Sequence, residues 1–176
     1  NAIGAAVVPL TPQHTDSEWA EIVADSNPSW VLEETELSEL AQSRGAELPE
    51  CPAELGETDP ALIRYSSGTT DGRAKGMVIS HRSLVLTFWL EAIEFGHRPG
   101  ALLLCALPWN GAGGFFVMRS LSVGGSAVLM RSFDAASWWQ LALEAETTHA
   151  LVGPTLAVRL VSALPAAHVR LTTVCS

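Results

Sequence analysis

The chain has 176 residues, of which 48% are apolar, and this length and composition predict a folded domain with a sizeable core rather than a disordered segment. Ten basic and nineteen acidic side chains give a formal charge of −9, so a polyanion-binding surface spread over the domain would work against its own field. We therefore expect no nucleic-acid partner.

The sequence contains no apolar run of membrane-spanning length, and its first residues lack the basic flank of a secretory signal. We therefore expect no transmembrane segment and a cytoplasmic protein. Cys51, Cys105 and Cys175 lie far apart and are odd in number, which argues against a disulfide framework. They are expected to be reduced thiols.

The first part of the chain alternates apolar runs of strand length with segments of helical period. This pattern predicts an α/β fold with a largely parallel sheet flanked by helices. A capping box at Thr15 and Glu18 starts the first expected helix. Strands are expected at residues 5–10, 30–32, 61–66 and 77–80, helices at 16–25 and 36–42, and a surface loop at 43–59.

The same alternation continues to the end of the chain. Helices are expected at residues 82–95, 114–121, 134–146 and 155–163, the third with Asp134 as its N-cap, and strands at 102–106, 127–130, 150–152 and 169–175. A parallel strand that ends without its crossover helix indicates that the domain continues. Residues 1–176 are therefore interpreted as a partial domain, truncated at both ends, with no second domain and with a tendency of the isolated chain to self-associate.

The loop between the strands expected at 61–66 and 77–80 is rich in glycine and hydroxyl side chains and holds Lys75, the only lysine. Glycines let backbone N–H groups approach a ligand, and hydroxyls with a cation suit a polyphosphate. It is not a Walker loop, because Arg73 stands where that motif needs glycine before its lysine. Phe116 likewise interrupts a dinucleotide-binding fingerprint after Gly111.

The run YSSGTTDGRAKG at residues 65–76, followed by Ser80 and His81, resembles the signature of the adenylate-forming superfamily, which includes acyl-CoA synthetases. Similar family motifs lie at residues 3–10, 107–108, 124–130 and 153–155, so the resemblance covers nearly the whole chain. It implies the ATP-binding N-terminal domain of an acid-activating enzyme.

The resemblance also implies roles for the residues of the loop. It makes Lys75 and Thr69 the catalytic residues, with Thr70 on the Mg²⁺ side. It assigns the phosphates of ATP to Ser66, Ser67, Gly68, Thr69, Thr70, Gly72 and Lys75. A solvated Gly/Ser turn without a ligand is the alternative interpretation of the same residues.

Three positions depart from the family pattern. Asp71 is inserted before Gly72, and Ala74 replaces a proline. A carboxylate about 4 Å from a phosphate would cost roughly 1–4 kcal/mol. Asn110 stands where the family usually has histidine. By resemblance, the acid pocket is lined by Trp109, Asn110, Gly111 and Gly113, and the alternative there is a simple turn.

Other conspicuous side chains are interpreted as structural. His81 is expected to start a helix and bond the local backbone, and His149 and His168 lack partners at suggestive spacing. At least one of Trp138 and Trp139 is expected in the core, because the apolar positions of their helix suit packing.

By resemblance, the full-length enzyme activates a carboxylic acid, fatty or another acyl acid, with ATP and Mg²⁺ and then forms a thioester with CoA. The acceptor could instead be a carrier-protein thiol, as in acyl-AMP ligases or peptide-synthetase adenylation domains. The chain by itself is expected to be inactive. A second hypothesis, motivated by Asp71, Ala74 and the missing histidine, is a degenerate nucleotide- or acyl-binding module.

Overall fold

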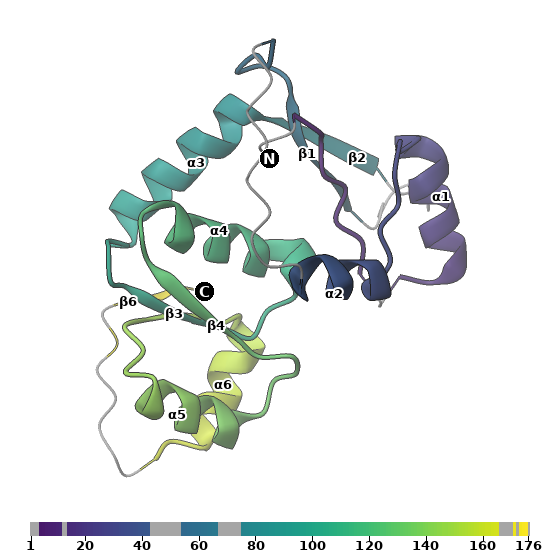
Figure 1. Ribbon diagram of the computed structural model, residues 1–176. Helices are drawn as coiled ribbons and strands as arrows, with labels where there is room; N and C mark the ends of the chain where they lie inside the picture. The colour runs from purple at the N-terminus through teal and green to yellow at the C-terminus, as the bar shows by residue number, and fades with distance from the viewer. Residues whose placement is uncertain are drawn as a thin grey trace. The chain divides into compact units, whose positions relative to one another are not determined.

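The computed structural model describes residues 4–11, 14–42, 54–66, 75–165, 171 and 173–175. The chain forms two compact units, residues 1–84 and residues 85–176 (Figure 1). None of the helices within the described ranges combines the length and apolar character that a membrane span requires.

The first unit contains two helices, a two-stranded hairpin and the start of a third helix. These elements are α1 (Asp16–Ser26), α2 (Glu34–Gln42), β1 (Pro60–Ser66), β2 (Lys75–Ser80) and α3 (His81–Glu94). α1 begins as expected, because the side chain of Thr15 accepts from the backbone of Glu18, whose carboxylate accepts from the backbone of Thr15. These backbone and side-chain hydrogen bonds lower the pKa of Glu18.

Two strand predictions for the first unit are wrong. Residues 5–10 make only an isolated parallel bridge, Val7 to Leu62, among the described residues, and Val7 is 51% exposed. Residues 30–32 are not a strand, and Trp30 is 75% exposed. An apolar run becomes a strand only where a neighbouring backbone satisfies its N–H and C=O groups along a ladder.

The second unit is a parallel four-stranded sheet in the order β4-β3-β5-β6. Its strands are β3 (Leu102–Cys105), β4 (Ser126–Leu129), β5 (His149–Leu151) and β6 (Thr173–Cys175). The connecting helices are α4 (Gly114–Ser122), α5 (Ala135–Glu144) and α6 (Pro154–Ser162). The expected α/β class with a largely parallel sheet is therefore confirmed. The side chain of Asp134 caps α5 by accepting from the backbone of Ser137, as its position predicts.

Helices cover both faces of this sheet, with α4 on one face and α5 and α6 on the other (Figure 1). Successive residues of a strand point to opposite faces, so Leu103 packs with Val117 of α4, while Leu104 packs with Trp138 and Leu160. Both strand residues are fully buried. This explains why β3 reads as a continuous apolar run.

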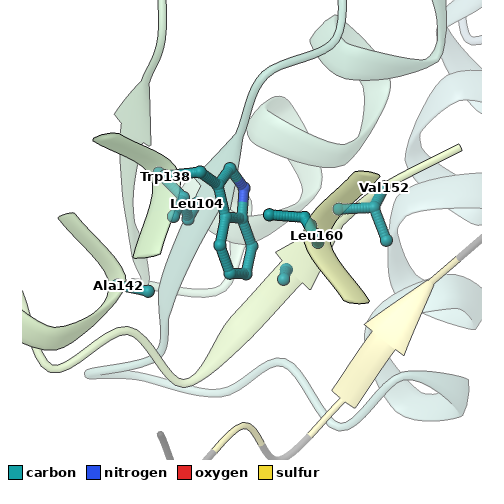
Figure 2. Packing of buried hydrophobic residues seen from close by; sticks show 6 residues of the cluster. Leu104, Trp138, Ala142, Val152 and Leu160 are labelled. Atoms are coloured by element: carbon teal, nitrogen blue, oxygen red, sulfur yellow. The ribbon is translucent and has the colours of Figure 1, made fainter. Parts of the chain in front are cut away.

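The face covered by α5 and α6 is filled by apolar side chains around Trp138, which is 1% exposed. Figure 2 shows its indole lying between Leu104 and Leu160. Trp139 stands edge-on to it and donates from Nε1 to the carbonyl of Leu160, 3.1 Å away. The prediction that at least one of these tryptophans belongs to the core is confirmed.

The face covered by α4 buries a group of polar side chains around Arg119. The Arg119 side chain is 0% exposed, and its Nη1 lies 2.9 Å from Oε2 of Glu91. Its guanidinium carbon lies 3.7 Å from the ring centre of Phe116. Its Nη2 lies 3.3 Å from Nε2 of His97, whose ring centre lies 4.3 Å from that of His149 with the rings tilted by 31°. We call Glu91, His97, Arg119 and His149 the Arg119 cluster.

Candidate active site

The described ends of the glycine- and hydroxyl-rich loop meet across an antiparallel hairpin. Ser66 is the last residue of β1, Lys75 is the first of β2, and the two are direct partners in the ladder. The structure thus brings together two predicted site residues that are nine positions apart in sequence. The Lys75 side chain is exposed, so its ammonium group is placed where an anionic ligand can reach it.

The middle of the loop lies outside the described residues. The predicted site residues in this part are Ser67, Gly68, Thr69, Thr70 and Gly72, and their roles stay predictions. The expected loop boundary at Gly76 is wrong, because Lys75 and Gly76 already pair with Ser66 and Tyr65 in the ladder.

The other end of the hairpin is held by contacts with the start of α3. The backbone N–H of His81 donates to the carbonyl of Asp59, and Arg82 forms an exposed ion pair with Glu57 at 2.9 Å. His81 starts the helix as expected. Its ring Nε2 has no hydrogen-bond partner among the described residues, so no bond from that nitrogen to the local backbone supports the expected role.

In the second unit, the strand order marks one edge of the sheet as a binding edge. The chain leaves β3 into α4 on one face and leaves β5 into α6 on the other, and these two strands are neighbours. In open α/β sheets, ligands bind at the carboxyl ends of strands where such a reversal occurs. This edge holds the residues that follow Cys105 and Leu151.

The segment after β3 contains every residue that was predicted for the acid pocket. Residues Trp109–Gly113, η1, form a kinked turn immediately before α4, with non-helical backbone angles at Gly111 (φ −107°, ψ −145°). Trp109 is exposed at this edge, and Asn110, Gly111 and Gly113 follow it in the same turn. The structure therefore gathers the four residues at one place on the binding edge.

Close backbone packing explains two glycines at this turn. A Cβ on Gly113 would lie 2.5 Å from the carbonyl oxygen of Leu107, and one on Gly114 would lie 2.1 Å from that of Trp109. No side chain could be accommodated there without a backbone shift. The turn can therefore adopt this tight shape only with glycine at both positions.

The same edge includes residues to which the sequence assigned no site role. Gly153 and Pro154 follow β5 and start α6, with Gly153 as the N-cap and Pro at the first turn. Only the strand order shows that they lie at this edge, and the strand order could not be predicted from the sequence. Cys105, at the end of β3, is buried next to the carbonyl of Leu107, and burial raises its thiol pKa. Such a thiol is an inert core group rather than a nucleophile.

Comparison with known proteins agrees with this arrangement. Residues 1–175 match the family model described as AMP-binding enzyme. The 4-coumarate–CoA ligase-like 5 protein of Oryza sativa subsp. japonica is 35% identical over 166 residues, covering 76% of this chain and 30% of that protein. Tyrocidine synthase 3 of Brevibacillus parabrevis is 31% identical over 112 residues, 54% of this chain and 2% of that protein.

Solved structures give the same result. A malonyl-CoA ligase, described as a ternary product complex with methylmalonyl-CoA and AMP bound, superposes with a TM-score of 0.76 at 32% identity. The superposition covers 93% of this chain and 38% of that one. ATP-bound MatB from Rhodopseudomonas palustris superposes at 0.72 with 25% identity, over 88% of this chain and 35% of that one. The chain therefore belongs to the AMP-binding enzyme family, and its fold is that of part of the N-terminal domain of adenylate-forming enzymes.

Proposed function

We propose that this chain forms part of an AMP-forming acid–thiol ligase, which activates a carboxylic acid, fatty or another acyl acid, as an acyl adenylate and transfers the acyl group to CoA. The observation that carries the proposal is the pairing of Ser66 with Lys75 at the ends of the signature loop. The ATP held by MatB and the AMP held by the malonyl-CoA ligase support a nucleotide as the ligand.

The chemistry needs electrostatic stabilisation and no protein nucleophile. A carboxylate oxygen of the acid attacks the α-phosphorus of ATP, a new P–O bond forms, and the bond to pyrophosphate breaks. Negative charge builds on the departing oxygens, and preorganised donors stabilise that charge. We assign this role to Lys75 as a clamp, together with Thr69 and the phosphate contacts of Ser66, Ser67, Gly68, Thr70 and Gly72.

We expect Mg²⁺ to accompany ATP and to be held mainly by the phosphates of the nucleotide. Mg²⁺ keeps several waters and is held by substrate phosphates with one or two protein oxygens rather than by an all-protein cage. Within the described ranges, no three His, Cys, Asp or Glu side chains gather into a cage. We assign the one protein oxygen from this chain to Thr70. Bound there, Mg²⁺ would supply charge neutralisation for the phosphates.

We place the acid at the carboxyl edge of β3 and β5, against Trp109, Asn110, Gly111 and Gly113. An exposed aromatic ring beside a glycine turn suits an apolar or aromatic acid. The relatives are named for 4-coumarate and malonyl ligases, so aromatic and dicarboxylic acids belong beside fatty acids in any test. The chain spans 30% of the rice relative's length, and we infer that a full catalytic cycle requires more chain than these 176 residues.

Two alternatives have an observation of their own. The similarity to tyrocidine synthase 3 favours a carrier-protein thiol as the acceptor, as in an acyl-AMP ligase or a peptide-synthetase adenylation domain. Asp71, Ala74 and Asn110, which depart from the family pattern, favour a degenerate nucleotide- or acyl-binding module.

The test is acid-dependent ATP–pyrophosphate exchange by the full-length protein, with fatty, aromatic and dicarboxylic acids. Lys75→Ala should lower the exchange rate through loss of one charge-assisted contact, worth about 1.5–3 kcal/mol or roughly a factor of 10 to 100. Arg82→Ala removes an exposed cation at the other end of the same hairpin and serves as the control. CoA thioester formation then separates the two acceptors. ATP binding without exchange for any acid would favour the degenerate module.

A further inference from the structure

The ring of Tyr65, the only tyrosine of the chain, lies against Gly76, the residue that follows Lys75. It lies in β1 directly opposite Gly76, and a Cβ on Gly76 would stand 2.9 Å from Cζ and 3.0 Å from the hydroxyl oxygen of the ring. Directly opposite residues in an antiparallel ladder share one face. An aromatic ring over a strand glycine holds the register of the pair. Gly76 therefore provides the space that lets the ring lie against the backbone beside Lys75.

The hydroxyl of the same ring reaches a different element. It donates to Oδ2 of Asp25 at 2.5 Å, and Asp25 lies one residue before the end of α1, 40 positions earlier in the chain. Burial, together with the hydrogen bond and charge of Asp25, raises the pKa of Tyr65 to about 12. The phenol is therefore protonated at neutral pH and available as a donor, and hydrogen bonds from O–H to a carboxylate are among the strong ones.

These two contacts connect α1 to the end of the hairpin that carries Lys75. The ring packs on the backbone at Gly76, and the hydroxyl holds the ring against α1, so a displacement of the backbone at Gly76 disturbs one of the two contacts. Ser66 and Lys75 are the last pair of the ladder among the described residues, and Tyr65 lies one position before it. The hydroxyl contact with Asp25 is therefore made by the residue next to the pair that contains Lys75.

We propose that Tyr65 and Asp25 are a positioning pair that holds Lys75 in place for its contact with the phosphates of ATP. This inference rests on the proposed function, because it assumes that Lys75 contacts ATP. Neither residue is proposed to touch the reacting atoms. Their effect is on where the ammonium group stands before ATP arrives, and misplacement of a binding group weakens binding even when the group itself is present.

The kinetic test uses Tyr65→Phe in the full-length protein, since phenylalanine keeps the ring over Gly76 and removes only the hydroxyl. KM for ATP and the dissociation constant for ATP should each rise about fivefold, with kcat and KM for the acid nearly unchanged. Asp25→Ala should give the same change or a smaller one, because the Tyr65 hydroxyl also interacts with the side chain of Ser26. The double variant should be no worse than Tyr65→Phe alone, because that variant already removes the contact with Asp25.

A second measurement follows the backbone directly. Hydrogen exchange of the amides at residues 75–76, without nucleotide, should be several-fold faster in Tyr65→Phe, while exchange at residues 61–62 stays unchanged. Glu57→Gln is the matched control, because it breaks an exposed side-chain contact of 2.9 Å at the opposite end of the hairpin. This control should leave the affinity for ATP as it is in the wild type.

The outcomes separate the inference from the function on which it rests. If Lys75→Ala lowers exchange but Tyr65→Phe changes neither ATP affinity nor amide exchange at 75–76, the positioning pair is refuted and the proposed function stands. If Glu57→Gln weakens ATP binding as much as Tyr65→Phe does, the role is not specific to this pair and is also refuted. If the wild type binds ATP but activates no acid, the proposed function fails, and the ATP dissociation constants alone decide the inference. A wild-type protein that binds no ATP would overturn both.

Discussion

The two faces of the four-stranded sheet are packed by different chemistry. On the face covered by α5 and α6, Trp138, Leu104 and Leu160 are buried with other apolar side chains. On the face covered by α4, the apolar cluster of Leu103 and Val117 adjoins a buried guanidinium group, Arg119. The first face is held by filled volume, whereas the second also depends on each polar partner being present and in the right protonation state.

This difference predicts how each face fails. Apolar packing loses stability in proportion to the volume removed and is insensitive to pH in the neutral range. The Arg119 cluster contains one cation that can be neither deprotonated nor solvated in place, so it must keep Glu91 and an uncharged His97 as neighbours. Substitutions and pH changes can therefore distinguish the faces.

The largest effect is expected at Trp138, which occupies the centre of the apolar face. Trp138→Ala should lower the local unfolding free energy by about 3–5 kcal/mol, because it removes a fully buried ring and leaves a cavity. Native-state hydrogen exchange of the β3 and β5 amides measures this loss. Val158→Ala on α6, where the side chain is 68% exposed, is the control and should cost well under 1 kcal/mol. Similar losses for the two variants would show that this face is not the core of the unit.

A smaller effect is expected when Arg119 loses its carboxylate. Glu91→Gln should destabilise the second unit by about 2 kcal/mol. This is below the usual cost of breaking a fully buried pair, because the Glu91 side chain is 31% exposed. The same change at Glu57, whose pair with Arg82 is exposed, should cost at most about 1 kcal/mol. The measurement is hydrogen exchange of α4 amides for the first variant and β1 amides for the second. Equal costs would mean that burial of Arg119 does not matter.

Elements whose signals are local could be predicted from the sequence. The caps at Thr15 and Asp134 depend on side chains within three residues, and both helices begin where those residues predict. Strand β3 was also found, because burial on both faces leaves a continuous apolar run, and β4 was found from its apolar run although it is only half buried. The runs at 5–10 and 30–32 look the same in sequence but lack a ladder among the described residues. Pairing is a property of two segments, so one segment cannot reveal it.

The candidate site divides in the same way. Lys75 and the glycine turn after Trp109 were proposed because short motifs mark them, and the structure places them at a hairpin end and at the carboxyl edge of β3, while their roles stay predictions. Gly153 required the strand order, and the Tyr65–Asp25 contact joins residues 40 positions apart. Arg119 and Glu91 are likewise separated by 28 positions. No spacing rule within one helix or strand connects such pairs.

The smallest expected effect is a pH dependence of stability, which His97 should give to the face covered by α4 only. Burial first, then the charges of Arg119 and His149, lower the pKa of His97 from its usual value to about 4. The groups around it are Glu91 on α3, Arg119 on α4, His149 on β5 and the neighbouring Arg98. A histidine that is held neutral in the folded state contributes its full stability above its unfolded pKa of about 6.5. That stability falls as the pH drops from about 6.5 towards 4, because His97 binds a proton in the unfolded state in this range but stays neutral in the folded state.

The second unit should therefore be about 1–2 kcal/mol less stable at pH 5 than at pH 7 through this histidine. His97→Gln removes the titrating group and should flatten that part of the pH profile, even if it lowers stability at pH 7. Trp138→Phe, on the opposite face, is the comparison, because it should lower stability by the same amount at both pH values. Urea unfolding of the wild type and of the two variants, each at pH 5 and at pH 7, gives the loss of stability between the two pH values for each protein. A pH loss that is as large in His97→Gln as in the wild type would assign the acid sensitivity to other groups and leave His97 as a packing residue only.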